Sequence, residues 1–568
     1  MKPINRASLL LLILFALTGC QRKPASDQGT EANQPTTAID FTWNNALVYF
    51  LLTDRFENGD PSNDIQFERS GETGVLRGFE GGDLRGVIRK LDEGYFTDLG
   101  VTALWLSPWF EQVHGGTDEG TGFTHGYHGY WTRDWTALDP NFGTAADLAE
   151  LVEKAHRRGI RIVMDVIANH TGPVTPLDPV WPEEWVRTEP RCTYRDYEST
   201  VTCTLVDNLP DVRTESLDNV DLPPALLAKW DAEGRLETEL AELDAFFERT
   251  GYPRAPRYYI IKWLTDYVRT YGVDGYRIDT AKHTEESVWG DLWEEVRVAF
   301  AQWKSDHPGE VLDDAPFYMV GEVYGYGISG GRSYDFGDRQ VDYFAQGLHC
   351  LINFEFKYNA REDYETLFSR YSRILNSELA GKGVLNYLSS HDDGDPFDKD
   401  RSRPMEAATK LLLCPGSAQL YYGDESLRPL QVEGAVGDAN LRSVMNWTDL
   451  AETGRPGVPS PAEVLDHCQK LGIFRRNHPA VGAGVHLQLG ADPYVFSRTY
   501  RMDGQTDAVV VALDLEEGDH TLPVSTVFTD GSRVRDAYSG WEGTVEKGEV
   551  SLRTRQPVVL LEQIRPLP

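Results

Sequence analysis

Four short segments each end an apolar run with acidic, amide or imidazole side chains. They are 165–171 (DVIANHT), 275–283 (GYRIDTAKH), 321–324 (GEVY) and 389–393 (SSHDD). Together they would supply carboxylate, guanidinium and imidazole groups to one common rim. Charged groups are costly to bury without a purpose, so their placement at the ends of predicted strands indicates a chemical site. The number of acidic residues alone would indicate nothing in so acidic a chain.

Two carboxyl groups on consecutive predicted strands have surroundings that assign them different roles. Asp279 follows Arg277 by two residues, so both side chains lie on one strand face, and a guanidinium favours the ionised carboxylate that a nucleophile requires. Glu322 ends an apolar strand near that negative charge, and both influences raise a carboxyl pKa, as suits a proton donor. Neighbouring strands lie about 4.8 Å apart, which is compatible with the roughly 5–5.5 Å carboxyl separation of retaining glycosidases. The sequence therefore predicts cleavage of glycosidic bonds with retention of configuration.

A third carboxylate and two histidines complete the predicted rim. Asp392 ends the seventh predicted strand, too far round to be a second acid on the same bond, and we expect it to hold sugar hydroxyls and support ring distortion. His170 and His391 are suited to hydrogen bonds with hydroxyl groups. A lone histidine is usually structural, but two at strand ends beside carboxylates favour a binding role.

The segments that position these residues alternate apolar strands with amphipathic helices, as parallel β/α units do. The predicted strands are 46–53, 101–107, 161–167, 275–279, 317–322, 350–356, 384–389 and 419–423. Helices such as 144–158, 258–271, 287–307 and 461–476 repeat apolar residues at spacings of three and four. Eight such units predict a closed (β/α)8 TIM barrel of the α/β class over 41–171 and 257–480, with its chemistry at the carboxyl ends of the strands.

Two segments interrupt or follow this alternation. Residues 172–256 separate the third strand from its helix and contain Trp181 and Trp185, so we predict a small inserted domain that walls the cleft. Residues 481–568 carry short apolar runs between Gly, Asp and Ser, which predicts an antiparallel β-sandwich at the carboxyl terminus.

The first residues are typical of an export signal. Lys2 and Arg6 precede an apolar stretch of about ten residues, too short to cross a bilayer, and we interpret 1–19 as a signal peptide. The tetrapeptide ending at Cys20 (LTGC) resembles a bacterial lipobox, which implies lipidation of Cys20 and an outer-membrane lipoprotein facing the periplasm or cell surface. An ordinary cleaved signal with a coincidental cysteine is the alternative. The polar residues 20–40 predict a flexible linker.

Charge and cysteine content narrow the remaining possibilities. A formal net charge of −34 disfavours nucleic acid and anionic lipid surfaces as partners. The five cysteines after Cys20 leave at least one unpaired, and Cys192 with Cys203 is the predicted disulfide. The other three lie in apolar or helical patterns that suit a protein core. They are Cys350, Cys414 and Cys468.

The order, spacing and residue identities of the four segments resemble the signature regions of the α-amylase family of glycoside hydrolases (family 13), and the resemblance extends over residues 46 to about 480. The sequence outside these four segments, including HGYHGYW and LPDVRTES, is most similar to periplasmic α-amylases of Gram-negative bacteria. The resemblance implies that Asp279 is the nucleophile, Glu322 the acid/base and Asp392 the transition-state stabiliser. It also implies contacts to the glucose at the cleavage point from Arg277, His170 and His391.

The same resemblance assigns further binding residues. The run 127–131 (YHGYW) resembles the segment that places an aromatic ring, here Tyr130 beside His128, under that glucose. Lys282 and His283 match the pair that α-amylases use on the leaving-group side. The implied substrate is an α-1,4-glucan or maltodextrin, cut by an endo-acting enzyme that we expect to be monomeric and to meet a membrane only through its lipid anchor.

Calcium is the expected cofactor, at one or two sites. An acidic and amide-rich turn near the amino terminus offers the oxygens that hard cations prefer, although such clusters are usually plain turns. Its candidate ligands are Asn58, Asp60, Asn63, Asp64, Gly81 and Asp83. The second site, implied by the resemblance, would tie the inserted domain to the barrel through Asn169, Asp211 and the carbonyl of His283.

Two other functions fit parts of the pattern. A 4-α-glucanotransferase would use the same residues with a sugar hydroxyl in place of water. A non-catalytic, membrane-anchored glucan-binding relative would be expected to lack one or more acids, whereas all three are present here with Arg277. The sequence therefore favours an enzyme, and a hydrolase before a transferase.

Overall fold

The computed structural model describes residues 41–452, 458–502 and 504–564. The predicted signal peptide 1–19, the lipidation site Cys20 and the linker 20–40 lie outside these ranges. Within them, no helix combines the length and apolar character needed to cross a membrane.

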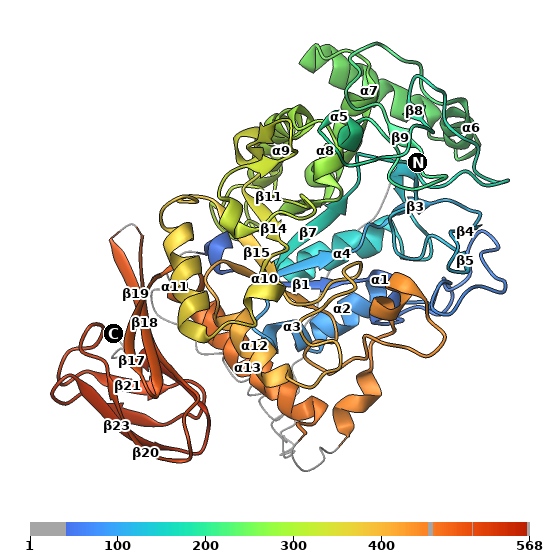
Figure 1. The fold of residues 1–568 in the computed structure, drawn as a ribbon. Coiled ribbons are helices and arrows are strands. Elements are labelled where there is room, and N and C mark those ends of the chain that lie inside the picture. Colours follow the sequence, from blue (N-terminus) through green and yellow to red (C-terminus); the bar gives the residue numbers. More distant parts are fainter. Residues whose placement is uncertain (1–40, 453–457, 503, 565–568) are drawn as a thin grey trace, which may run out of the picture. The chain divides into compact units, whose positions relative to one another are not determined.

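Eight parallel strands form a closed barrel, in which each strand pairs with the next and the last pairs with the first (Figure 1). Every residue of these strands is buried, which explains why their sequences read as continuous apolar runs. In order around the barrel they are β1 (Leu47–Leu51), β2 (Ala103–Leu106), β7 (Arg161–Val166), β10 (Gly275–Ile278), β11 (Tyr318–Gly321), β14 (Cys350–Asn353), β15 (Gly383–Tyr387) and β16 (Ser417–Tyr421). The eight predicted strands and the barrel are confirmed, with end points that differ by up to three residues.

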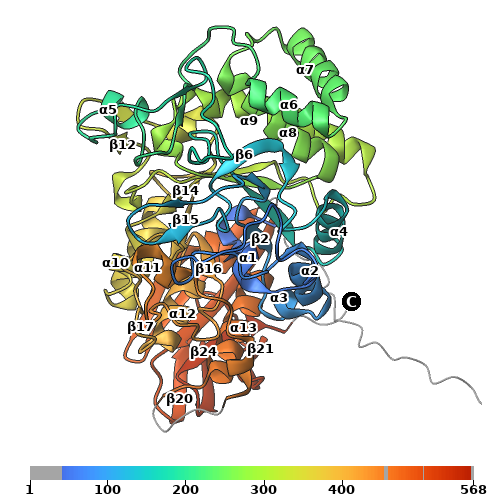
Figure 2. The ribbon, with the colours of Figure 1, turned by 90° about the vertical axis from the view of Figure 1, so that its right-hand side faces the viewer.

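Helices enclose this barrel (Figures 1 and 2). Their first turns show why they begin where they do, since Thr144 and Asp147 form a reciprocal capping box, as do Ser460 and Glu463. The longer helices are α2 (Leu84–Asp92), α4 (Ala145–His156), α8 (Pro256–Tyr271), α9 (Ser287–Asp306), α11 (Tyr364–Leu375), α12 (Pro404–Leu413) and α13 (Pro461–Asn477). Short helices are α1 (Thr53–Phe56), α3 (Tyr95–Asp98), α10 (Phe356–Asn359) and α14 (Ala480–Ala483).

The chain between β7 and α8 builds a separate region beside the barrel, together with the hairpin of β3 (Phe110–Gln112) and β6 (Thr132–Leu138). Its elements are β8 (Val186–Arg187), α5 (Glu198–Val201), β9 (Asp211–Val212), α6 (Pro224–Ala232) and α7 (Leu236–Thr250). Trp181 and Trp185 are buried, and their rings meet Trp135 of β6 and Trp263 of α8. This tryptophan cluster joins the inserted segment to the barrel.

The disulfide Cys192–Cys203 is present, as predicted. In the described ranges the other three cysteines, Cys350, Cys414 and Cys468, are free and buried, which confirms their assignment to the core.

The carboxyl-terminal part is an antiparallel β-structure, which confirms the predicted β-sandwich. One sheet has the strand order β17-β18-β19-β24-β21-β22, and β20 pairs with β23. The strands are β17 (Val485–Ala491), β18 (Tyr494–Met502), β19 (Gln505–Leu513), β20 (Gly518–Pro523), β21 (Arg533–Asp536), β22 (Glu542–Thr544), β23 (Glu549–Thr554) and β24 (Val558–Gln563). Alternate residues of β23 are buried, as the period of a half-exposed strand requires.

Candidate active site

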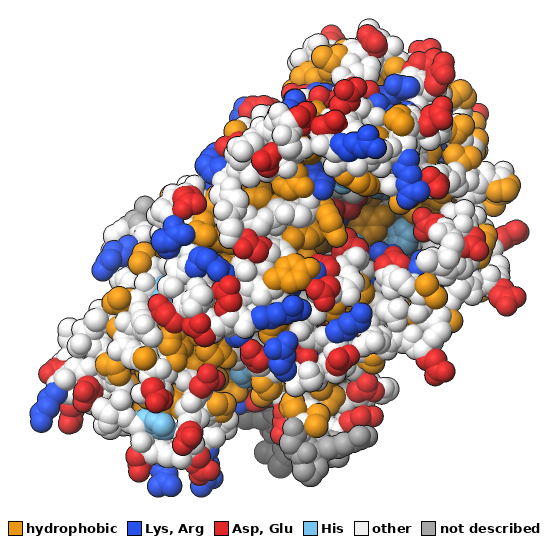
Figure 3. Space-filling view, in the orientation of Figure 1, with side chains coloured by type: hydrophobic (Ala, Val, Ile, Leu, Met, Phe, Trp, Pro, Cys, Tyr) orange, Lys and Arg blue, Asp and Glu red, His pale blue; other side chains and the backbone are white. Residues whose placement is uncertain are grey.

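The carboxyl ends of β10 and β11 bring two predicted site residues side by side. Ile278 pairs with Gly321 in the barrel, so Asp279 and Glu322 follow directly after paired positions. The amide of Glu322 donates to the carbonyl of Ile278 (2.9 Å), which extends the ladder by one more step. Figure 3 shows a hollow on the face that Figure 1 presents, with hydrophobic, acidic and histidine side chains on its walls.

Arg277 joins these carboxyl groups to a third one. Its Nη1 lies 2.7 Å from Asp279 Oδ1 and 2.9 Å from Asp165 Oδ1, and its Nη2 lies 3.0 Å from Glu322 Oε2. The guanidinium is 1% exposed, so water does not screen these contacts. One cation therefore serves three buried carboxyl groups.

This shortage of positive charge decides where a proton is held. Burial raises the pKa of Glu322 well above its usual range; Arg277 opposes the rise, and the charges of Asp279 and Asp392 add to it. Burial likewise raises the pKa of Asp165 to about 7. Glu322 is thus protonated under conditions in which a solvated carboxyl group would be ionised, as a general acid must be.

Asp392 differs from Asp279 and Glu322 in exposure, and its pKa is shifted in the opposite direction to that of Glu322. Its side chain is 32% exposed, against 8% for Asp279 and Glu322. Burial would raise the pKa of Asp392, but His391 and Arg277 outweigh burial and lower it. Ser390 Oγ donates to Asp392 Oδ1 (2.9 Å), so an ionised carboxylate is held at the open side of the site.

Three of the predicted substrate-binding histidines, His128, His170 and His391, lie around Tyr130. Its ring lies 5.1 Å from that of His391 at an angle of 19°. His170 Nε2 lies 3.1 Å from the Tyr130 carbonyl, and the Tyr130 amide donates to His128 Nδ1 (3.0 Å). Burial lowers the pKa of His391 to about 4, and it lowers the pKa of His128 and of His170 as well. These imidazoles are neutral near pH 7 and can both donate and accept hydrogen bonds.

Lys282 and His283 lie on a short turn that also touches Glu322. The chain leaves β10 through Thr280, whose φ of 47° turns the backbone, and the Thr280 amide donates to Glu322 Oε2 (2.8 Å). Lys282 Nζ donates to the carbonyl of Tyr324 (2.9 Å), two residues beyond Glu322. The two residues of this turn are therefore adjacent to the proton donor.

Asp165 is a site residue that the sequence analysis did not assign. It pairs with Arg277 across β7 and β10, and it accepts hydrogen bonds from Tyr130 Oη (2.8 Å) and Trp105 Nε1 (2.9 Å). Its strand shows an acid in an otherwise apolar run, which is a signal for a buried polar contact. Its partner could be named only once the barrel register was known.

The first candidate calcium set is only partly gathered. Asn58 Oδ1 and Asn63 Oδ1 are buried without a hydrogen-bond partner, and Asn58 Nδ2 donates to Asp64 Oδ1. Asp60 accepts hydrogen bonds from Ser62 instead. The carboxylate of Asp83 caps α2 and accepts hydrogen bonds from the backbone amides of Gly59, Asp60 and Gly86. Gly81 lies so close to Asn58 and Asp64 that a Cβ there would meet both side chains. The two orphaned amide oxygens and Asp64 fit a hard cation.

The residues of the second candidate calcium set meet at the side-chain amide of Asn169. Asn169 Nδ2 donates to Asp211 Oδ1 (2.8 Å) and to the carbonyl of His283 (2.9 Å). Half a turn of this amide exchanges its nitrogen for its oxygen, which would direct three oxygens to one point. Arg187 Nε also lies 2.8 Å from Asp211 Oδ2, so a cation would share that carboxylate with a guanidinium. In the described ranges no three His, Cys, Asp or Glu side chains are grouped for a metal, so amide and carbonyl oxygens would be needed.

Comparison with known proteins identifies the class to which this barrel and site belong. The family model for the α-amylase catalytic domain matches residues 50–447. The chain is 37% identical over 520 residues to the periplasmic alpha-amylase of Escherichia coli (strain K12), covering 81% of this chain and 71% of that protein. It is 27% identical over 558 residues to an alpha-amylase of Streptomyces lividans, covering 85% of this chain and 56% of that protein.

A solved structure agrees at the level of the fold. An Anoxybacillus alpha-amylase superposes with a TM-score of 0.63 at 22% identity, covering 93% of this chain and 100% of that one. The chain belongs to the α-amylase family of glycoside hydrolases.

Proposed function

We propose that the protein is a retaining α-glucoside hydrolase that cleaves α-1,4 bonds in starch-like glucans and maltodextrins. Glu322 protonates the glycosidic oxygen while Asp279 attacks the anomeric carbon and forms a covalent glycosyl ester. Glu322, now ionised, then takes a proton from water, whose oxygen displaces Asp279. The observation that carries this proposal is the single guanidinium of Arg277 between Asp279 and Glu322, with the pKa of Glu322 raised.

The remaining rim residues bind and distort the sugar. Asp392, ionised and partly exposed, faces the positive charge that develops on the ring in the oxocarbenium-like transition state. Tyr130 offers an aromatic face for the same ring, and the neutral imidazoles of His128, His170 and His391 hold its hydroxyl groups. Lys282 and His283 contact the sugar on the leaving-group side.

Incubation with maltoheptaose and soluble starch tests the reaction. Proton NMR in the first minutes should show new reducing ends as the α-anomer, because two displacements restore the configuration. Initial release of the β-anomer would refute the double displacement. Chromatography separates hydrolysis from glucanotransfer, since maltooligosaccharides longer than the substrate would identify a 4-α-glucanotransferase.

Calcium is part of the proposal as a structural ion. Bound by Asn169, Asp211 and the His283 carbonyl, or by Asn58, Asn63 and Asp64, it would cross-link chain segments through charge and oxygen coordination. Chelation should lower the melting temperature, and added Ca²⁺ should restore it. An unchanged melting temperature together with no calcium by elemental analysis would sink both sites.

The export signal and lipid anchor complete the proposal. The similar Escherichia coli protein is named a periplasmic alpha-amylase, which supports export of this chain. The LTGC sequence at residues 17–20 supports lipidation at Cys20. Metabolic labelling with radioactive palmitate should mark the protein in the outer-membrane fraction, and Cys20→Ala should remove the label. Unlabelled protein in the soluble periplasmic fraction would point to an ordinary cleaved signal.

A further inference from the structure

The loop closed by Cys192–Cys203 contacts His283, one of the two residues assigned to the leaving-group side. Within it, the amide of Thr193 donates to the carbonyl of Ser199 (3.1 Å), and α5 forms a single turn just before Cys203. The carbonyl of Thr200, inside that turn, lies 3.0 Å from His283 Nδ1 in a buried contact. A proton held on Nδ1 leaves Nε2 as the acceptor nitrogen, so this loop determines the tautomer of His283 as well as its position.

A second line of contacts runs from the same loop to Lys282. The Tyr197 ring lies 5.1 Å from Phe336, and Phe336 lies 5.0 Å from Tyr334. The hydroxyl of Tyr334 accepts a hydrogen bond from Lys282 Nζ (3.2 Å). Both residues assigned to the leaving-group side are therefore supported by the disulfide-closed loop.

Polar contacts dock this loop on the barrel side. The Tyr197 hydroxyl donates to the carboxylate of Glu286, and the guanidinium of Arg339 covers the Tyr197 ring at 3.3 Å. The Tyr197 amide donates to Asp338 Oδ1 (2.9 Å). Tyr197 is thus the point at which the loop is attached.

We propose that the loop 192–203 is a positioning element for the sugar on the leaving-group side, and that its disulfide holds it in the working conformation. This inference rests on the proposed function. Thr200 and Tyr197 touch no reacting atom, and they act through His283 and Lys282. The binding and departure of a leaving glucan then depend on the oxidation state of Cys192 and Cys203, whereas protonation by Glu322 and attack by Asp279 do not.

Two substrates separate this role from general stabilisation. Maltoheptaose places glucose units on both sides of the cleaved bond, whereas 2-chloro-4-nitrophenyl α-maltotrioside places an aryl group on the leaving-group side. Dithiothreitol converts the disulfide to two thiols and becomes its own cyclic disulfide. On reduction, kcat/KM for maltoheptaose should fall roughly ten- to a hundredfold, because a displaced positioning group costs this much. The value for the aryl substrate should stay within about twofold.

Variants and controls keep the test specific. The double variant Cys192→Ser, Cys203→Ser should behave as the reduced protein does, and dithiothreitol should not change it further, because the other cysteines in the described ranges are free thiols and buried. Tyr197→Phe keeps the disulfide but removes the donor to Glu286, and it should shift the same ratio less. Tyr252→Phe, whose ring packs on Tyr258, is the matched control that should leave the ratio unchanged. All assays contain excess Ca²⁺, because the carbonyl of His283 belongs to a candidate calcium set.

The outcomes are distinguishable from failure of the proposed function. Turnover of both substrates by the oxidised protein tests that function alone. The loop inference is overturned if opening the disulfide lowers kcat/KM for the two substrates equally, or changes neither. Calorimetry of maltoheptaose binding to Glu322→Gln, with the disulfide closed and then open, measures the affinity for the substrate without turnover. We expect this affinity to fall when the disulfide is opened.

Discussion

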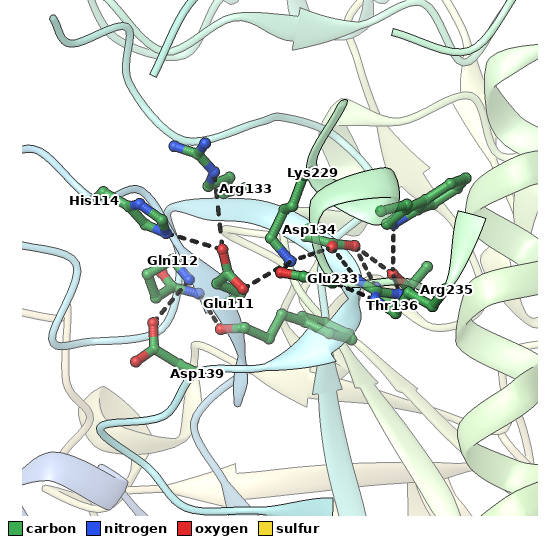
Figure 4. Close-up of polar contacts among 12 residues, drawn as sticks. Glu111, Gln112, His114, Arg133, Asp134, Thr136, Asp139, Lys229, Glu233 and Arg235 are labelled. Atoms are coloured by element: carbon green, nitrogen blue, oxygen red, sulfur yellow. Dashed lines mark hydrogen bonds and ion pairs between the residues drawn. The ribbon is translucent and has the colours of Figure 1, made fainter. Parts of the chain in front are cut away.

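Two of the regions that bury ionic groups in this molecule treat charge in opposite ways. The first is the rim around Arg277. The second, here called the hairpin network, consists of Glu111 and Asp134 on the β3–β6 hairpin with Lys229 of α6 and Arg235, which precedes α7 (Figure 4). The inserted segment supplies Lys229 and Arg235 to the hairpin network, and both regions contain carboxylates at most 8% exposed.

In the hairpin network, two cations contact the two buried acids, and they also contact Glu233 and Glu239, which are more exposed. Lys229 Nζ lies 2.9 Å from Glu111 Oε2 and 2.8 Å from Asp134 Oδ2, and Arg235 Nη2 lies 2.7 Å from the same Asp134 oxygen. Burial would raise the pKa of Asp134, but Lys229 and Arg235 outweigh burial and lower it. Burial would lower the pKa of Lys229, but Asp134 and Glu111 outweigh burial and raise it. Asp134 and Lys229 are therefore held as an ion pair, which suits a clamp between hairpin and helix.

The rim instead has one cation for three acids, and burial there leaves a proton on a carboxyl group. The difference teaches that burial alone does not mark a catalytic group. The ratio of cations to carboxyl groups decides whether a buried acid is a fixed ion or a proton donor.

The largest effect is expected where the rim loses its nucleophile. Asp279→Asn should lower kcat on maltoheptaose by at least about 10⁴-fold, because no covalent intermediate can form. Its melting temperature should not fall, since the variant removes one acid from a site that has more carboxyl groups than cations. Activity within tenfold of the unaltered protein would contradict the role assigned to Asp279, and a large loss of stability would contradict the proposed charge surplus.

The hairpin network should respond in the reverse manner. Lys229→Met leaves two buried carboxylates short of a cation and should lower the free energy of unfolding by about 3 kcal/mol, measured by urea denaturation. Its kcat should change little. The matched control is Lys154→Met, whose partners are more exposed and whose effect should stay within about 1 kcal/mol. Equal effects of both variants would remove the distinction between clamp and surface pair.

A third buried set gives a smaller and pH-dependent effect. His478, at the end of α13, lies 2.9 Å from Asp507 and 2.7 Å from Glu562 of the carboxyl-terminal sheet. Burial opposes its charge, but these two acids outweigh burial and raise the pKa of His478 to about 9. Because this pKa exceeds the unfolded value of about 6.5, the stability is fully present below that pH and is lost as the pH rises through about 9.

His478→Gln should therefore flatten the pH dependence of stability between about pH 6.5 and 9, where the unaltered protein loses about 2–3 kcal/mol. Denaturant titrations across this range measure it. A variant that keeps the same slope would show that His478 is not the group responsible.

The smallest predicted shift, that of the Glu322 pKa, tests the coupling between acids at the rim. The charge of Asp392 helps to raise the pKa of Glu322, so Asp392→Asn should lower that pKa. The alkaline limb of kcat/KM for an aryl maltotrioside should then move to lower pH, by about one unit or less. A shift to higher pH, or none, would contradict the electrostatic account of Glu322.

Much of the fold and the main site residues could be predicted because they depend on local patterns. Eight apolar runs separated by amphipathic helices have one economical closure, and the period of two along β10 places Arg277 and Asp279 on one face. The cysteines at 192 and 203 are close enough in sequence for their pairing to be expected. Thr200 acts through its carbonyl oxygen, which every residue has, so no sequence signal could identify it.

The sequence by itself determined which segments are buried and which side chains end the strands, since both follow from the spacing of apolar residues along the chain. Only the tertiary structure decided which acid meets which cation. Asp165 meets Arg277 because the barrel closes in one register, and Asp134 meets Lys229 because α6 folds back on the hairpin. Such contacts join residues far apart in the chain, and their energies depend on burial and distance, which no local pattern records.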